Sequence, residues 1–174
     1  MKSLGIDIGS SSVKVSLLDI ASGECAASSA NPATEMPIGS PQSGWAEQDP
    51  EYYWRSLGEA CRQLWASVDI DKSQIAGVSL TTQRGTLINV DAAGQPLRPA
   101  ILWLDQRRAE VAGSIKGPWG WLFKIAGVQA TVDHFRAQAE VNWVAQEQPE
   151  IAAKTDKVLL LSGFLSHRLT GRFV

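Results

Sequence analysis

The sequence predicts an α/β fold, because runs with the alternation of strands are followed by runs with the periodicity of amphipathic helices. Apolar and polar residues alternate over residues 13–17, after a turn rich in glycine and serine. Apolar residues recur at steps of three and four over residues 54–68, which is the spacing of one helical face. With 174 residues, the chain is long enough for one domain with its own core.

Composition and charge exclude several classes of protein. The content of 44% hydrophobic and 20% charged residues is typical of a globular protein. The 16 basic and 18 acidic side chains are spread without blocks, so no nucleic-acid or membrane-surface partner is expected. No apolar stretch has the length of a membrane span or the form of a signal peptide. Cys25 and Cys61 lack metal-ligand or redox spacing, which favours the cytoplasm, and a small-molecule partner is expected.

The first half of the chain has the pattern of a β-meander followed by a helix and further strands. Alternating or β-branched runs between turn residues predict strands over residues 4–8, 13–17, 25–30, 75–82 and 86–90. Residues 31–49 contain three prolines and no periodicity, so we expect a loop there. Pro50 suits the first position of a helix, whose apolar stripe would consist of Trp54, Leu57, Cys61, Leu64 and Val68.

The second half predicts more helices than strands. Helical segments are expected over residues 105–115, 119–126, 133–147 and 163–170, and short strands over residues 99–102 and 157–161. Ser162 would cap the last helix and Gly171 would end it. Residues 172–174 have the pattern of another strand that begins, so we expect a domain that is truncated at its C-terminal end.

The first group of residues suited to chemistry lies in the first predicted hairpin. Asp7 ends a strand, Gly9, Ser11 and Ser12 follow in the turn, and Lys14 begins the next strand. Glycine and serine allow the backbone to approach a phosphate closely, lysine adds a positive charge, and an aspartate can hold Mg²⁺ directly or through water. The alternative is an ordinary hairpin turn with Lys14 on a solvated face.

Two further groups follow predicted strands, which is the usual place for ligand contacts in α/β proteins. Gln83 can both donate and accept hydrogen bonds, and the planar fork of Arg84 suits neighbouring oxygens of a polyol. Trp103 could stack on a sugar and Asp105 could accept from its hydroxyls. The alternatives are two solvated side chains in a turn, and a core tryptophan beside an aspartate that caps a helix.

Taken together and in this order, the motifs resemble the FGGY family of carbohydrate kinases. The matching stretches are residues 5–14, 44–50, 82–85, 103–107 and 165–171. The resemblance implies a ribonuclease-H-like (actin-like ATPase) domain, with a mixed β-sheet and flanking helices. It also implies that residues 1–174 form the N-terminal kinase domain, incomplete at its C-terminal end, and that the second domain is absent.

The resemblance further implies ATP-dependent phosphorylation of a sugar or polyol hydroxyl by a longer parent protein, with Mg²⁺ bridging the phosphates. The phosphate side would consist of Asp7, Gly9, Ser11, Ser12 and Lys14, with Asp7 as the metal ligand. The sugar side would consist of Gln83, Arg84, Trp103 and Asp105. The general-base aspartate is expected beyond Val174, so we expect no turnover from this chain alone.

Two alternatives accompany this interpretation. One is a short, non-catalytic member of the family that acts as a binding or interaction module. The other is a non-sugar ATPase of the same fold, against which the Gln83–Arg84 and Trp103–Asp105 pairs argue. Glycerol kinases carry a glutamate where Gly85 stands, and xylulokinases a histidine where Arg84 stands. The resemblance therefore gives a class of acceptor and not a particular sugar, and it leaves a homodimer of the parent open.

Overall fold

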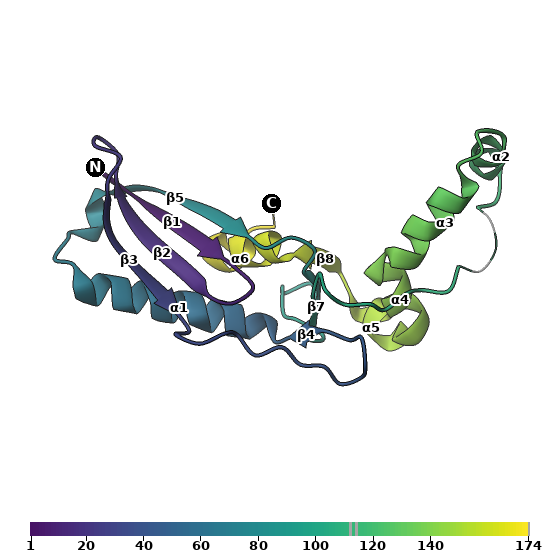
Figure 1. Ribbon diagram of the computed structural model, residues 1–174, viewed down its shortest axis with the longest axis horizontal. Helices are drawn as coiled ribbons and strands as arrows, with labels where there is room; N and C mark the ends of the chain where they lie inside the picture. Colours follow the sequence, from purple (N-terminus) through teal and green to yellow (C-terminus); the bar gives the residue numbers. More distant parts are fainter. Residues whose placement is uncertain (112, 114, 174) are drawn as a thin grey trace.

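A computed structural model describes residues 1–111, 113 and 115–173 and contains two four-stranded β-sheets with helices packed beside them (Figure 1). The first sheet has the order β3-β2-β1-β5 and consists of β1 (Lys2–Ile8), β2 (Val13–Asp19), β3 (Cys25–Asn31) and β5 (Ile75–Thr82). The first three strands are antiparallel neighbours, whereas β5 pairs in parallel with β1. The predicted mixed sheet with flanking helices is confirmed.

The main core lies between the first sheet and helix α1 (Pro50–Ser67). Because side chains alternate across a strand, one face of the sheet contributes every buried apolar residue of the hairpin: Leu4, Ile6, Ile8, Val13, Val15 and Leu17. The buried face of α1 is centred on Tyr53, Leu57, Ala60 and Leu64. The predicted stripe is therefore rotated by about one position, and Trp54 and Cys61 are only half-buried.

The second sheet is small and entirely antiparallel. Its order is β4-β7-β6-β8, and its strands are β4 (Glu47–Gln48), β6 (Leu87–Val90), β7 (Ala100–Ile101) and β8 (Lys157–Leu160). The segment predicted as a loop over residues 31–49 thus contains a strand at its end. Strands of two residues carry no periodicity, which is why the sequence does not reveal β4.

The remaining helices are the 3₁₀-helix η1 (Lys72–Gln74), α2 (Pro118–Ile125), α3 (Gln129–Gln138), α4 (Glu140–Glu147), α5 (Pro149–Lys154) and α6 (Leu161–Thr170). Helix α6 adds Leu161, Phe164 and Leu165 to the main core. Helix α3 leads away from the body and carries α2 at its far end (Figure 1). Over the described ranges, no helix combines the length and the apolar character needed to cross a membrane.

Several predicted elements differ from the structure. Residues 105–111 and 113 form no helix, and residues 112 and 114 lie outside the described residues. The helix predicted over residues 133–147 is divided at Ala139, whose ψ of 108° is that of an extended residue. Helix α6 begins at Leu161 without a side-chain cap, so the cap predicted at Ser162 is wrong, whereas Gly171 ends the helix with a φ of 71°.

At the end of the described chain, Arg172 and Phe173 are not part of a strand, and Val174 lies outside the described residues. The Phe173 ring stacks on His167 with a centroid separation of 4.0 Å. This packing folds the last described residues back onto α6.

Candidate functional site

The turn between β1 and β2 is closed by its own backbone and presents its serines to solvent. The Gly9 N–H donates to the Ser12 carbonyl at 3.0 Å, and a Cβ added at Gly9 would lie 3.3 Å from that oxygen. The Met36 N–H donates to the Ser11 carbonyl at 3.1 Å, which holds the backbone while Ser10 and Ser11 remain exposed. The turn is open enough for an anion to approach its N–H and hydroxyl groups.

Asp7 and Lys14 lie opposite one another on β1 and β2 and have exposed side chains. Because Ile6 and Ile8 are buried against the helices, the Asp7 carboxylate lies on the other face of the sheet. On that face a hollow of ≈ 340 Å³ is lined by Gly5, Ile6, Asp7, Lys14, Ser16, Ser79, Leu80 and Thr81. A carboxylate and an ammonium group therefore face the same space.

The described residues contain no group of three or more His, Cys, Asp or Glu side chains arranged to hold a metal ion. Asp7 would thus be a single protein ligand. Mg²⁺ is commonly held by one or two carboxylates together with substrate phosphates and waters. Asp7 fits a magnesium ion that arrives with a phosphate, and does not fit a metal centre built from protein ligands alone.

The second predicted group begins where β5 ends, and it is bonded directly to the first. The Gln83 N–H donates to the Ile8 carbonyl at 2.8 Å, immediately before the turn between β1 and β2. The Gln83 side chain turns inward, and its Nε2 donates to Tyr53 Oη at 2.8 Å and to Thr86 Oγ1 at 3.0 Å. Burial of Tyr53 raises the pKa of its phenol above the ordinary value. Arg84 is exposed beside it.

Gly85 brings the second and third predicted groups together. Its φ of 67° lies in the left-handed region, and a Cβ added there would be 3.0 Å from Trp103 Cβ and 3.4 Å from Trp103 Cα. The Trp103 side chain is nevertheless mostly open to solvent, with an exposed fraction of 60%. Arg84 and Trp103 are therefore exposed side chains on two loops that touch.

Trp103 lies in a turn that is held at both ends by one residue, Ala46. The Asp105 N–H donates to the Leu102 carbonyl at 3.0 Å and closes the turn. The Leu102 N–H donates to the Ala46 carbonyl at 3.0 Å, and the Ala46 N–H donates to Asp105 Oδ2 at 2.6 Å. We call these two hydrogen bonds to Ala46 the Ala46 clasp.

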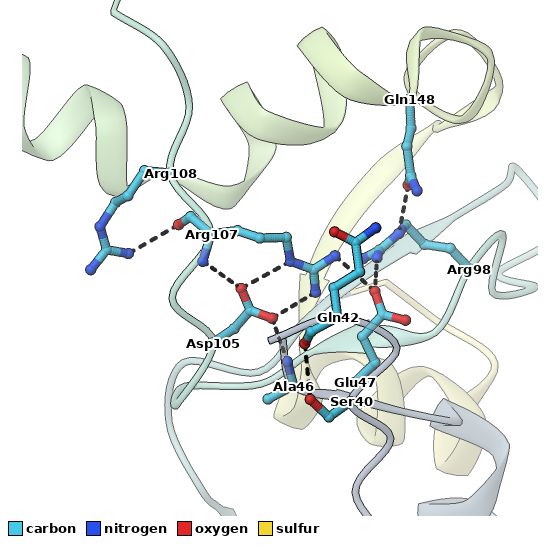
Figure 2. Close-up of polar contacts among 9 residues, drawn as sticks. All are labelled: Ser40, Gln42, Ala46, Glu47, Arg98, Asp105, Arg107, Arg108 and Gln148. Carbon is cyan, nitrogen blue, oxygen red and sulfur yellow. Dashed lines mark hydrogen bonds and ion pairs between the residues drawn. The ribbon is translucent and has the colours of Figure 1, made fainter. Parts of the chain in front are cut away.

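The Asp105 carboxylate belongs to a buried charged network, shown in Figure 2. Its Oδ1 accepts from the Arg107 backbone N–H at 2.8 Å and from Nε at 2.9 Å, and its Oδ2 accepts from Nη2 at 2.7 Å. Burial would raise the pKa of the Asp105 carboxyl, but the hydrogen bonds from Arg107 and Ala46 outweigh it and lower that pKa. Asp105 is therefore a carboxylate with both oxygens engaged.

Arg107 connects this turn to residues far away in the sequence. Its Nη1 donates to Glu47 Oε1 at 2.8 Å, and Glu47 also pairs with Arg98, whose Nε donates to Gln148 Oε1 at 2.8 Å (Figure 2). The Arg107 guanidinium packs against the rings of both Trp45 and Trp143, at 4.2 Å and 4.6 Å from their centroids. Sequence reasoning did not assign roles to these partners, because they come from three segments that are far apart in the chain: residues 45–47, residue 98 and residues 143–148.

The match to a family model decides the relationship. Residues 2–174 match the N-terminal domain of the FGGY family of carbohydrate kinases. The chain belongs to this family. The expectation drawn from the five motifs is thereby confirmed, and the FGGY N-terminal domain accounts for nearly every residue of the chain.

Individual FGGY kinases are similar over the same region. The xylulose kinase of Escherichia coli is 34% identical over 170 residues, which cover 98% of this chain and 34% of that protein. The glycerol kinase of Thermococcus gammatolerans is 34% identical over 145 residues, covering 80% of this chain and 29% of that protein. The xylulose kinase of Rhodospirillum rubrum has the same fold, with a TM-score of 0.79 at 21% identity over 100% of this chain and 35% of that one. The chain therefore spans about a third of the length of the relatives it matches.

The structure brings the predicted FGGY motifs together through direct contacts. The Gln83–Ile8 hydrogen bond joins the first to the second, and the Gly85–Trp103 contact joins the second to the third. Arg84 and Trp103 are available to a ligand, whereas the side chains of Gln83 and Asp105 are engaged within the protein. That any of these residues binds a ligand stays a prediction.

Proposed function

We propose that this chain is part of an ATP-dependent sugar or polyol kinase. It contributes the turn at residues 9–12, which we call the phosphate turn, and one wall of the acceptor site. The Gln83–Ile8 hydrogen bond carries the proposal, because it fixes the acceptor loop directly beside the phosphate turn. The names of the relatives, xylulose kinase and glycerol kinase, give the class of acceptor. Transfer of a phosphoryl group requires the two substrates to meet in line, and adjacent loops meet this requirement.

On the phosphate side, each residue has a distinct task. Gly9 lets the backbone approach the phosphates, and the turn offers N–H donors together with the hydroxyls of Ser11 and Ser12. Lys14 adds a positive charge on the same face of the sheet, and Asp7 is the residue that would hold Mg²⁺. A magnesium ion held there with ATP would supply positive charge against the negative charge that develops during transfer.

On the acceptor side, Trp103 offers an apolar ring face on which a sugar can stack, and Arg84 offers paired donors to neighbouring hydroxyl oxygens. Gln83 and Asp105, the other two residues predicted for the acceptor side, form hydrogen bonds within the protein and support this wall from behind. We place the general-base aspartate outside residues 1–174, in the longer protein that contains this chain. Half of a closed site would lose most of the positioning and charge stabilisation on which the transfer depends, so residues 1–174 alone give no measurable turnover.

The test compares Asp7→Asn with Asp71→Asn in the longer protein, by steady-state kinetics with ATP and with xylulose or glycerol. Loss of the metal-binding carboxylate at Asp7 lowers kcat by about a hundredfold or more. Asp71 is an exposed carboxylate that caps η1, and its substitution leaves kcat within about twofold.

Two results would overturn the proposal. One is that the unaltered longer protein, supplied with ATP, phosphorylates no pentose, hexose or polyol. The other, directed at the placement of the base, is an ordinary sugar kinase rate from purified residues 1–174.

A further inference from the structure

We infer that Asp105 is a positioning residue that fixes the turn presenting Trp103, and that it does not bind the acceptor itself. The inference rests on the proposed function and deepens it, because it distinguishes the residue that contacts the sugar from the residue that positions the contacting side chain. Trp103 touches the acceptor, while Asp105 acts through Trp103.

The Asp105 carboxylate has no capacity left for a sugar hydroxyl. Oδ1 accepts two hydrogen bonds from Arg107, and Oδ2 accepts one from Arg107 and one from the Ala46 N–H. A carboxylate offers about four lone-pair sites, so all of them are occupied. The Asp105 side chain is only 2% exposed, and a sugar would have to displace a buried guanidinium to reach it.

The same carboxylate controls where Trp103 lies. Ala46 holds Leu102 through its carbonyl and Asp105 through its N–H, so the Ala46 clasp fixes both ends of the turn. Trp103 and Leu104 form the middle of that turn and are 60% and 38% exposed. Since little packs against the Trp103 indole, the position of its ring depends on the ends of the turn and on the contact of its Cβ with Gly85.

The clasp is rigid because Arg107 cannot move away from Asp105. The Arg107 side chain is 2% exposed, packs against the rings of Trp45 and Trp143, and pairs with Glu47 as well as with Asp105. Trp45 and Trp143 also meet edge to face at a centroid distance of 5.2 Å. Because the Arg107 guanidinium is held in place, its hydrogen bonds hold the Asp105 carboxylate in place. The hydrogen bond from the Ala46 N–H to that carboxylate then holds the turn.

A spectroscopic test needs no ligand and uses residues 1–174 as described. The tryptophans are labelled with 5-fluorotryptophan, and the ¹⁹F resonance of Trp103 is assigned with Trp103→Phe. In Asp105→Asn, the Trp103 resonance shifts and broadens, while the resonances of Trp119 and Trp121 in α2 stay in place. Asp71→Asn is the matched control and leaves the resonances of Trp103, Trp119 and Trp121 unchanged. An unchanged Trp103 resonance in a folded Asp105→Asn protein overturns the inference.

Because Asp105→Asn removes a buried countercharge and can prevent folding, Asp105→Glu provides a second variant. It keeps the negative charge for Arg107 but moves the carboxylate outward by one methylene, which breaks the hydrogen bond from Ala46. The expected result is again a displaced Trp103 resonance. A resonance identical to that of the unaltered chain contradicts the inference.

A double-mutant cycle in the longer protein tests the role in catalysis, with xylulose and glycerol as acceptors. Asp105→Glu raises the KM of the acceptor by about tenfold and leaves the KM of ATP within about twofold. In a Trp103→Ala background the same substitution changes the acceptor KM by less than about twofold, because the residue through which Asp105 acts is gone. Additive effects would mean that Asp105 binds the acceptor directly. If the longer protein phosphorylates no pentose, hexose or polyol, the proposed function fails, while the ¹⁹F measurement still decides the clasp.

Discussion

The turn at residues 9–12 and the turn at residues 102–105 both present exposed side chains, but they are held in different ways. The first is closed by a hydrogen bond between Gly9 and Ser12 and flanked by the hairpin to which it belongs. The second is held by Ala46, and behind it by Arg107 and its partners from distant segments. The first turn is held mainly by its own hairpin, with one hydrogen bond from the distant Met36 N–H to the Ser11 carbonyl, whereas the second is held chiefly by tertiary contacts.

Because the two turns are held differently, we expect substitutions in them to change the free energy of unfolding by different amounts. The Ser10 and Ser11 side chains of the first turn are exposed, so substitutions there affect ligands more than folding. The second turn depends on buried charges, and removal of one partner leaves an uncompensated charge. We therefore expect substitutions in the buried network to act first on stability, and substitutions in the phosphate turn to act on nucleotide binding alone.

The largest expected effect is that of Glu47→Ala. Glu47 is the common partner of Arg98 and Arg107, whose side chains are 5% and 2% exposed. Without it the buried Arg98 loses its ion-pair partner and Arg107 keeps only Asp105, so the free energy of unfolding falls by about 3–5 kcal/mol. Urea unfolding of residues 1–174, followed by circular dichroism, measures this loss.

The matched control is Glu59→Ala, which breaks an exposed pair with Arg62 on the surface of α1. Exposed pairs of this kind contribute little, so its effect stays below about 0.5 kcal/mol. Equal losses in the two variants would show that the buried network stabilises the fold no more than an exposed ion pair does. The proposed energetic difference between the two turns would then be wrong.

A smaller effect is expected for Gly85→Ala, compared with Gly23→Ala. Both glycines have positive φ values, 67° and 75°, so both substitutions introduce backbone strain. Only at Gly85 does the new Cβ meet a neighbour, Trp103 Cβ at 3.0 Å, whereas nothing lies within 4 Å at Gly23. We expect losses of about 2–3 kcal/mol and about 1 kcal/mol in the free energy of unfolding, respectively. Thermal and urea unfolding measure both, and similar losses would remove Gly85 as a support of the Trp103 turn.

The sequence predicts the local turn well because the information for it is contiguous. The alternation over residues 13–17 fixes which face of β2 is buried, and the small residues at 9–12 mark the bend. The strands of the first sheet, helix α1 and the end of α6 at Gly171 follow from the same kind of short-range signal, whereas the parallel pairing of β5 with β1 does not. The family motifs supply the order of the candidate residues, but not their contacts.

The second turn could not be predicted, because the forces that hold it act between residues far apart in the chain. Asp105 satisfies the local pattern of a helix cap, and a helix over residues 105–115 is predicted from it, but residues 105–111 form no helix. In the folded chain Arg107 packs against Trp45 and Trp143, and this tertiary contact overrides local helix propensity. A charged residue two positions after an aspartate gives no sign that both will be buried.

The smallest effect on stability, and the clearest separation of the two turns, is expected for Ser11→Ala with Ser10→Ala as its control. Both serines are exposed, so both substitutions change the free energy of unfolding by less than about 0.5 kcal/mol. Only the Ser11 hydroxyl is proposed to donate to a phosphate, and loss of a hydrogen bond to a charged group raises the KM of ATP by about tenfold or more. Kinetics of the longer protein at varied ATP concentration measure this change. A KM that rises equally in the two variants would mean that the turn acts through its shape and not through the Ser11 hydroxyl, whereas a loss of stability in Ser11→Ala would show that this turn too is part of the fold's support.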